Sequence, residues 1–268
     1  MDGDTGMKVG IVGYGWVGKA MYQLFPGAYI YDPYSKEKNT YFTESKDLIN
    51  SCDIVFVCVP TPCINETVLD TSIVEKVVSW LKCPLIVIRS TVNPGTCDYL
   101  SKEYGKNIVM QPEFLGETPS HPFLDSKTRQ FLVIGGNTGD RRKLIELYST
   151  VYNSNITIRQ LTNYEAEVVK LTENRAIGFK VMQLHELYLV CEKAGVDYYI
   201  IRDTVYGDDP RFDLWFSFIY PDNLGFSSSK CLVKDIPAWA AWAESVGINP
   251  ELTRVLIKKS NDYKGIKV

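Results

Sequence analysis

Three glycines near the start of the chain restrict its fold more than any other feature. Residues 8–12 form a short, largely apolar run that indicates a strand, and residues 19–25 favour a helix. Between them stand Gly13, Gly15 and Gly18, in the order GYGWVG. In a strand–turn–helix unit the first glycine permits a tight turn, the second lets the backbone approach a pyrophosphate, and the third allows close packing of helix on strand. The segment therefore predicts a dinucleotide-binding unit, with the phosphate charge at the helix N-terminus.

An acidic residue stands at the distance from these glycines that such a unit requires. The strand candidate 29–31 is followed by Asp32, 19 positions after Gly13. A carboxylate there accepts hydrogen bonds from ribose hydroxyls and repels a 2′-phosphate, which favours NAD over NADP, although Lys36 and Lys38 lie nearby. The residues expected to bind the cofactor are Gly13, Tyr14, Gly15, Trp16, Val17, Gly18, Asp32, Val59, Pro60, Thr61 and Thr91.

Short apolar runs alternate with helical patterns, such as residues 72–81, through the first part of the chain. The runs are residues 54–59, 85–88, 108–110 and 131–134. Continuous apolar strands separated by helices are typical of a parallel sheet covered on both faces. We therefore expect an α/β chain that begins with a Rossmann-type doubly wound parallel sheet in residues 1–158, with residues 1–6 as a flexible extension.

The pattern changes after residue 158. From residue 164 to residue 194 apolar side chains recur at helical spacing without a proline, which predicts one long helix. Residues 195–268 contain no clear strand. We therefore expect an all-helical domain in residues 159–268, built on the long helix. Aromatic and apolar residues of the long helix that its own domain does not need could pair with a second copy, so a homodimer is expected.

Composition and charge exclude several classes of function. The 29 basic residues nearly balance the 32 acidic ones, for a formal charge of −3, so no broad cationic surface for nucleic acid is expected. The seven cysteines include no CxxC pair and no Cys/His cluster, which argues against a disulfide framework or a metal site. No apolar run approaches the roughly 20 residues of a membrane helix, and the N-terminus lacks the features of a signal peptide. We therefore expect a cytoplasmic chain without metal or membrane contact.

Two segments rich in hydroxyl groups follow apolar strands. Residues 57–62, VCVPTP, and residues 89–96, RSTVNPGT, stand at carboxyl ends of expected parallel strands, the edge where open α/β sheets bind ligands. Their prolines, Pro60 and Pro94, would also serve simply to end a strand. The hydroxyl groups suit loops that contact a nicotinamide ribose or a substrate, whereas Cys58 between two valines suits an inert core thiol.

Six segments follow one another in a fixed order: GYGWVGKA, VCVPTP, STVNPGT, QPEFLGE, EAEVVKLTEN and KCLVKD. In this order they resemble the UDP-glucose/GDP-mannose dehydrogenase family over nearly the whole chain. The resemblance implies a nucleotide-sugar 6-dehydrogenase, which uses NAD to oxidise a sugar alcohol to the carboxylate, as in UDP-glucose to UDP-glucuronate for polysaccharide biosynthesis. The 268 residues leave no counterpart for the family's C-terminal UDP-binding domain. We therefore expect a shortened form that binds its sugar nucleotide poorly, takes a smaller substrate or receives that domain from a partner.

A cysteine is the nucleophile that this chemistry implies. Oxidation of an alcohol to an acid needs two hydride transfers, and a thiolate that captures the intermediate aldehyde as a thiohemiacetal permits the second transfer, which gives a thioester. Cys231, in KCLVKD, matches the catalytic cysteine of the family, and Lys230 and Lys234 beside it favour the thiolate. A cysteine beside two lysines is by itself more often structural, so the match to the motif is what favours a nucleophile.

Two residues of the long helix are implied to stabilise the developing oxyanion. Lys170 and Asn174 are four residues apart and share a helix face. The family uses the matching lysine and asparagine on the alkoxide and on the thiohemiacetal oxygen. A solvated pair of Glu167 and Lys170 on an exposed helix face is the alternative.

The resemblance also implies roles for carboxylates and for contacts with substrate. Asp235, Glu113 and Glu117 would activate or order the hydrolytic water, and Thr91 would position that water or the reacting hydroxyl. The residues implied to contact substrate are Phe114, Leu115, Arg211 and Lys234, and Glu186 also matches a family position.

The chain departs from the family in two of these segments. Residues 225–231 read GFSSSKC where the family usually has GFGGSC, and Gly116 replaces an arginine or lysine.

Two alternatives stay open. A two-electron dehydrogenase of the 3-hydroxyacid type would not need Cys231, and a non-catalytic NAD-binding remnant would bind cofactor without turnover.

Overall fold

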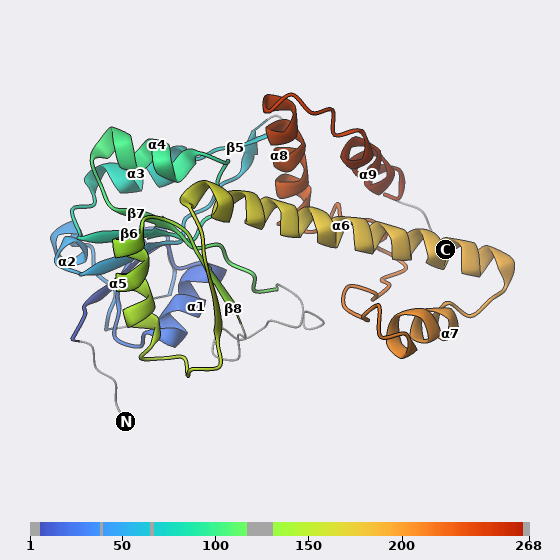
Figure 1. Cartoon of the computed structure of the whole chain (residues 1–268), viewed down its shortest axis with the longest axis horizontal. Helices are drawn as coiled ribbons and strands as arrows, with labels where there is room; N and C mark the ends of the chain where they lie inside the picture. The colour runs from blue at the N-terminus through green and yellow to red at the C-terminus, as the bar shows by residue number, and fades with distance from the viewer. Residues whose placement is uncertain (1–5, 38–39, 65–66, 117–130, 265–268) are drawn as a thin grey trace. The chain divides into compact units, whose positions relative to one another are not determined.

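The computed structural model describes residues 6–37, 40–64, 67–116 and 131–264 (Figure 1). These residues divide into two compact units. The first unit contains the described residues up to Lys170, except for Gly116 and the segment 63–68. The second unit contains those exceptions and every described residue from Leu171 onward.

The first unit is built on a parallel sheet of five strands in the order β2-β1-β3-β6-β7. The central strands are buried along their whole length, because helices cover both faces of the sheet. The strands are β1 (Val9–Val12), β2 (Tyr29–Tyr31), β3 (Ile54–Val57), β6 (Leu85–Ile88) and β7 (Ile108–Met110).

Alternate residues of each strand enter two separate cores. Val55 and Val57 of β3 pack with the helices of one face, whereas Ile54 and Phe56 pack with those of the other. The first face holds α2 (Lys46–Asn50), α3 (Ser72–Trp80) and α4 (Thr96–Tyr104), and the second holds α1 (Trp16–Leu24) and α5 (Thr138–Tyr148) (Figure 1). The predicted Rossmann-type doubly wound fold is confirmed.

Two small sheets accompany the main one. β8 (Phe131–Ile134) pairs in parallel with β9 (Thr157–Gln160), and β4 (Cys63–Ile64) pairs with β5 (Val68–Leu69). The apolar run 131–134 is therefore a strand as predicted, but its ladder partner is β9 and not the five-stranded sheet. The amide of Gly135, directly after β8, donates to the carbonyl oxygen of Met110 at 2.7 Å, which ties the end of β8 to the end of β7.

The second unit is helical. Its main element is α6 (Asn163–Ala194), 32 residues without a break, which confirms the predicted long helix. The domain boundary predicted at residue 158 lies in front of this helix, whereas the compact units divide inside it, after Lys170. The later elements are α7 (Tyr198–Arg202), a π-helix (Asp203–Asp208), α8 (Leu232–Ser245) and α9 (Glu251–Asp262). No helix in the described part of the chain is long and apolar enough to cross a membrane.

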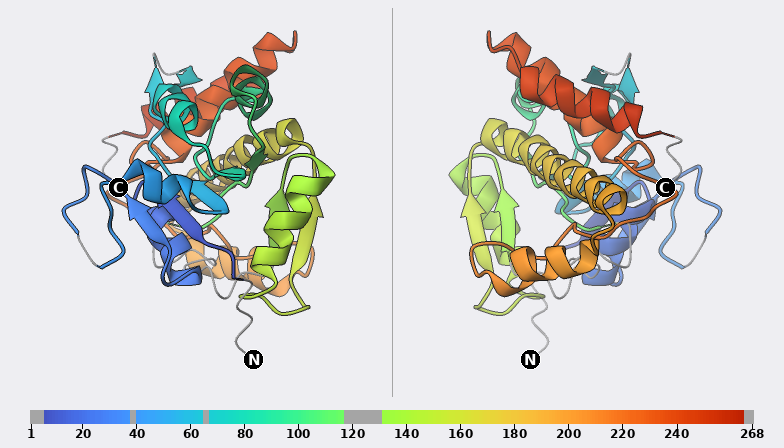
Figure 2. Two further views of the ribbon diagram at one scale, coloured as in Figure 1. Left: turned by 90° about the vertical axis from the view of Figure 1, so that its left-hand side faces the viewer. Right: turned by 90° about the vertical axis from the view of Figure 1, so that its right-hand side faces the viewer.

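Close packing of α6 on α8 depends on a glycine. A Cβ atom added to Gly178 would lie 2.4 Å from Cδ1 of Ile236, nearer than two carbon atoms can approach. Ile236 is fully buried, and it shares a core with Leu256 of α9. Helices α8 and α9 lie side by side (Figure 2). The single glycine inside α6 therefore permits the contact between helices on which the core of this unit rests.

Candidate functional site

The three glycines of the fingerprint have separate steric roles. Gly13 has a φ of +91°, and a Cβ there would lie 2.6 Å from the carbonyl oxygen of Cys58 at the end of β3. A Cβ on Gly18 would lie 2.0 Å from the carbonyl oxygen of Gly13. Among the described residues other than Gly15 and its two neighbours in the chain, no atom lies within 4 Å of a Cβ built on Gly15. Gly13 and Gly18 are thus required by the protein itself, and Gly15 leaves backbone open to a ligand.

The start of α1 and the end of β2 complete this loop. The N-cap residue of α1 is Gly15, which has no side chain to cap the helix, and the amide groups and dipole at this end favour an anion. The carboxylate of Asp32 accepts the amide of Tyr14 at 2.7 Å on one oxygen and those of Tyr34 and Ser35 at 2.9 Å and 3.1 Å on the other. Two carboxylate oxygens have about four acceptor positions, so Asp32 is held in place with capacity left for a ribose hydroxyl. These residues fit a dinucleotide.

The other residues predicted to bind the cofactor lie on α1 and on the loop after β3. Trp16 is half exposed and Val17 partly buried at the start of α1, and Tyr14 stacks edge-on against Phe42. After β3, Thr61 is buried and Pro60 is exposed. The carbonyl oxygen of Val59 accepts the hydroxyl of Ser90 at 2.7 Å, which joins this loop to the one after β6 that carries Thr91. Thr91 itself is partly buried.

A buried ion pair that the sequence did not reveal holds the QPEFL segment. Arg89 follows β6, is 2% exposed, and pairs with Oε2 of Glu113. The same guanidinium donates to the carbonyl oxygen of Gln111 at 2.8 Å. Oε1 of Glu113 accepts the amides of Phe114 and Leu115 at 2.7 Å and 3.0 Å. Glu113 therefore fixes the backbone of its own segment, and Glu117 lies outside the described residues.

Lys170 and Glu167 are both buried, so the interpretation as a solvated pair on an exposed face is wrong. The Nζ atom of Lys170 lies 5.2 Å from the centre of the Phe114 ring. The carboxylate of Glu167 accepts the amides of Gly95 and Cys97 at 2.6 Å and 2.8 Å, and so caps the N-terminus of α4. Burial raises the pKa of Glu167 to about 7, against the opposing effect of these two amides.

In the second unit, Cys231 directly precedes α8 and is partly buried. Asp235, one turn further on, is fully buried. It accepts the side-chain amide of Asn174 at 2.5 Å and the Nζ atom of Lys234 at 2.6 Å. The structure thus brings together three of the predicted residues, and it places Cys231 at a helix N-terminus, where a thiolate is favoured.

Most of the other cysteines are unsuited to nucleophilic chemistry. Burial raises the pKa of Cys52 and Cys58 to about 12 and that of Cys83 to about 11, and it also raises the pKa of Cys97 well above its usual value. All seven cysteines lie in the described part of the chain as reduced thiols. Within the described residues, no group of three or more His, Cys, Asp or Glu side chains is placed to hold a metal ion.

The remaining predicted substrate residues lie apart in sequence and differ in exposure. Phe114 is buried and Leu115 partly buried. Arg211 has a side chain that is 80% exposed, and its guanidinium pairs with Asp209 at 2.6 Å. Glu186 is exposed on α6.

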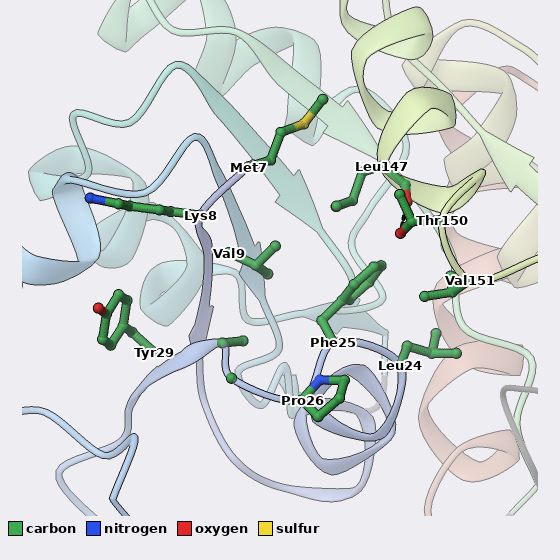
Figure 3. A pocket seen from close by; sticks show the side chains of 12 residues that line it. Met7, Lys8, Val9, Leu24, Phe25, Pro26, Tyr29, Leu147, Thr150 and Val151 are labelled. Carbon is green, nitrogen blue, oxygen red and sulfur yellow. Dashed lines mark hydrogen bonds between the residues drawn. The ribbon is translucent and has the colours of Figure 1, made fainter. Parts of the chain in front are cut away.

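A cavity of about 380 Å³ lies at the amino ends of β1 and β2 (Figure 3). Its lining includes Lys8, Phe25, Tyr29 and Leu147. Asp32 follows the opposite, carboxyl end of β2, so this cavity is separate from the cofactor loop. Its lining residues are none of those predicted to serve the reaction.

Residues 28–155 match the NAD-binding domain of the UDP-glucose/GDP-mannose dehydrogenase family, and residues 164–263 match the central domain of the same family. The chain belongs to this family. The match confirms the resemblance found in the sequence, and it assigns NAD as the cofactor of the first unit, in agreement with the open backbone at Gly15 and with the carboxylate of Asp32.

Curated relatives agree with the family assignment. The chain is 32% identical over 189 residues to the uncharacterized protein MJ1054 of Methanocaldococcus jannaschii. That alignment covers 65% of this chain and 21% of MJ1054. It is 29% identical over 224 residues to UDP-glucose 6-dehydrogenase of Rickettsia typhi, which covers 78% of this chain and 49% of that enzyme. The chain thus spans about half the length of the Rickettsia relative, and less of MJ1054.

Solved structures establish the same fold. A UDP-glucose dehydrogenase from Pyrobaculum islandicum aligns with a TM-score of 0.78 at 22% identity, over 96% of this chain and 68% of that one. A 3-hydroxyisobutyrate dehydrogenase from Mycobacterium tuberculosis aligns with a TM-score of 0.73 at 13% identity, over 96% of this chain and 93% of that one. At these identities the likeness concerns the fold alone, and members of both dehydrogenase groups share it.

Proposed function

We propose that this chain forms the cofactor-binding and catalytic part of a nucleotide-sugar 6-dehydrogenase. The observation that carries the proposal is the buried contact of Asn174 with Asp235, four residues after Cys231. Two polar residues from distant segments, both expected to serve one reaction, meet beside the cysteine that is expected as its nucleophile. Membership of the family supports the same conclusion, and a UDP-glucose-like sugar nucleotide is the proposed substrate.

The cofactor is held by the loop that begins at Gly13. The backbone at Gly15 and the N-terminus of α1 would receive the pyrophosphate, and Asp32 would accept a ribose hydroxyl. When bound, NAD accepts a hydride at each of the two oxidations. Thr61 and Thr91, on the loops after β3 and β6, would contact the nicotinamide end of the cofactor and the reacting hydroxyl.

Cys231 carries the covalent part of the proposed reaction. After the first oxidation its thiolate attacks the carbonyl carbon of the aldehyde, a C–S bond forms, and the carbonyl oxygen becomes the alkoxide of a thiohemiacetal. Oxidation of the thiohemiacetal gives a thioester. Water then adds to the thioester carbonyl, the C–S bond breaks, and the thiolate leaves as the acid forms. Because α8 begins directly after Cys231, the dipole at the N-terminus of this helix favours the thiolate. It does so both when the thiolate attacks the aldehyde and when it leaves the thioester.

Lys170 and Asn174 stabilise the negative oxygen in these steps. They are one helical turn apart on α6, so their side chains leave the helix on the same face. An amide nitrogen carries two hydrogens, and Asn174 can therefore hold Asp235 and also donate to an oxyanion. Asp235 orders the hydrolytic water. We assign Glu113 to the positioning of Phe114 and Leu115, because its carboxylate already serves Arg89 and two amides.

Stoichiometry tests the proposed function. The full chain is incubated with NAD and a panel of UDP- and GDP-sugars, and NADH is counted against acid product. Two NADH per acid support the proposal, and one NADH with no acid supports the two-electron alternative. Cys231→Ser should stop acid formation, whereas Cys83→Ser, which changes a partly buried thiol with a pKa of about 11, should not. Cofactor binding without any turnover across the panel would contradict the proposal.

We also propose that the chain forms a homodimer through its second unit. Large apolar side chains between residues 199 and 220 are exposed there, including Ile200 at 65%, Trp215 at 48% and Tyr220 at 52%. Large apolar side chains exposed within one short segment are available to pack against a second copy. Light scattering of the purified chain should give twice the mass of 30.4 kDa, and Ile200→Asp with Trp215→Ser should halve it. A monomeric wild-type chain would overturn this proposal.

A further inference from the structure

His185 is a buried histidine of α6 with a specific partner. Its side chain is 3% exposed, and Nδ1 accepts the backbone amide of Gly225 at 2.8 Å. Because Nδ1 is an acceptor, the ring is neutral and carries its proton on Nε2. Burial lowers the pKa of His185, and a hydrogen bond with the backbone of Phe218 opposes that effect. The imidazole thus connects α6 to two points on the segment that leads to Cys231.

The contact at Gly225 is sterically demanding. Gly225 has a φ of +82°, and a Cβ there would lie 2.8 Å from both the carbonyl and the hydroxyl oxygen of Ser260 in α9. The next amide, that of Phe226, donates to Oγ of Ser260 at 2.9 Å. Side chains from α6 and α9 therefore fix two successive amides at the start of the segment that ends in Cys231.

Hydrogen bonds between residues close in sequence continue from Phe226 to the residue after Cys231. The amide of Ser229 donates to the carbonyl oxygen of Phe226 at 3.0 Å. The hydroxyl of Ser229 accepts the amide of Leu232 at 3.1 Å, and Leu232 is the residue after Cys231. Hydrogen bonds and short stretches of backbone thus link the ring of His185 to Leu232, the residue after Cys231.

The far side of the cysteine is fixed by the same helix. Asn174 holds Asp235, and Asn174 and His185 are 11 residues apart. Eleven residues make close to three turns of an α-helix, so both side chains leave the same face of α6, separated by about 16 Å along its axis. One face of α6 therefore holds both ends of segment 225–235.

We propose that His185 is a positioning residue for Cys231. It acts through the amide of Gly225, by fixing the start of the segment that carries the thiol, and not by contact with substrate. This inference rests on the proposed function at one point, the assignment of Cys231 as the nucleophile. The restraint on Cys231 is a property of the folded chain and is measurable without substrate.

A matched pair of variants separates the acceptor from the shape of the side chain. Asn and Leu both branch at Cγ, but only Asn has an oxygen where His185 has Nδ1. His185→Asn should therefore keep the bond to Gly225, and His185→Leu should lose it. A purely structural core position would tolerate Leu at least as well as Asn, since Leu is the apolar residue of the two.

The rate at which iodoacetamide modifies Cys231 in the full chain is the measurement, followed by peptide mass spectrometry. Cys97 and Cys191, at 0% and 4% exposure, report general unfolding in the same sample. His185→Leu should raise the rate at Cys231 about tenfold, the effect of one lost hydrogen bond on a local opening equilibrium. His185→Asn should stay within about threefold of the wild type, and Cys97 and Cys191 should stay protected in both variants.

Equal rates at Cys231 in the Asn and Leu variants would overturn the proposal. If His185→Leu exposes Cys97 and Cys191, Ser260→Ala is the second variant, because it removes the acceptor of the Phe226 amide and leaves α6 intact. An unchanged rate in that variant would also overturn it. Failure of the proposed function has a different signature, because the wild type would then release no NADH while the labelling rates keep their order.

Discussion

The buried guanidinium of Arg89 and the carboxylate of Glu113 form an ion pair inside the first unit, and Glu113 uses its second oxygen to hold the amides of Phe114 and Leu115. The side chains are 0% and 7% exposed. One carboxylate therefore neutralises a charge at the end of β6 and shapes the segment after β7.

Glu113→Ala should lower the free energy of unfolding by about 3–5 kcal/mol, because it leaves the charge of Arg89 buried and uncompensated. Urea denaturation followed by circular dichroism measures this change. Glu37→Ala is the control, since it breaks an exposed pair with Lys19, at 43% and 61% exposure, and should cost under about 1 kcal/mol. Equal losses in the two variants would show that the buried pair has no special role.

Gly15→Ala should weaken cofactor binding and leave stability unchanged, whereas Gly18→Ala should lower stability. A methyl group at residue 15 meets no protein atom within 4 Å, so the variant should keep its melting temperature, but it should bind NAD at least tenfold more weakly because the methyl group faces the pyrophosphate. Gly18→Ala should lower the melting temperature, because its methyl group meets the carbonyl oxygen of Gly13. Thermal scans and titration calorimetry with NAD make the comparison. A destabilised Gly15→Ala protein would contradict it.

Asp32 should determine the preference for NAD over NADP. Asp32→Ala removes the acceptor of the ribose hydroxyls and should weaken NAD about 10- to 100-fold, while NADP should change less because the repulsion of its 2′-phosphate is also removed. Dissociation constants from fluorescence titration give both values. Asp53→Ala, which removes an acceptor of a backbone amide near the other end of the sheet, should leave both constants unchanged. A wild-type chain that bound NADP as tightly as NAD would refute this role.

Glu167 should make stability fall as pH rises. Its pKa in the folded chain is about 7, above the usual 4.5, so between these values the folded state holds a proton that the unfolded state has released. The free energy of unfolding should decrease from pH 4.5 to pH 7, by at most about 3 kcal/mol from this group. Glu167→Gln cannot release a proton and should remove that part of the slope in urea denaturation.

Glu165, two residues earlier, provides the control with the opposite sign. Hydrogen bonds from Thr162 lower its pKa, so its contribution is present at neutral pH and is lost as the pH falls through the folded value. Glu165→Gln should therefore leave the slope between pH 5 and pH 7 as it is in the wild type. If Glu167→Gln also left that slope unchanged, the raised pKa of Glu167 would be refuted.

The parts of this molecule that the sequence predicted are those set by local pattern. The spacing of Gly13, Gly15 and Gly18 after a strand has one steric solution, and the structure has it. The period of the apolar side chains predicted α6 to within a residue of its start, because a helix of 32 residues repeats its signal about nine times. The continuous apolar runs predicted strands that are buried on both faces, because a strand with one exposed face would alternate apolar and polar residues.

What the sequence did not predict depends on contacts between distant residues. Glu167 caps α4 through Gly95, 72 positions away, so nothing in its own neighbourhood on the chain signals a buried carboxylate. In the sequence Arg89 belongs to a hydroxyl-rich segment expected to form a loop. Its ion pair with Glu113, 24 positions further on, places it in the core. His185 accepts the amide of Gly225, 40 positions further on, and no pattern near either residue signals that contact.

The close approach of α6 to α8 at Gly178 and Ile236 has a consequence for how such a chain can vary over generations. A methyl group at residue 178 would displace Cδ1 of Ile236, the flexible end of a buried side chain, and a shorter residue 236 alone leaves a void. Substitutions at the two positions are therefore coupled, and a larger residue at 178 is accommodated best beside a smaller one at 236.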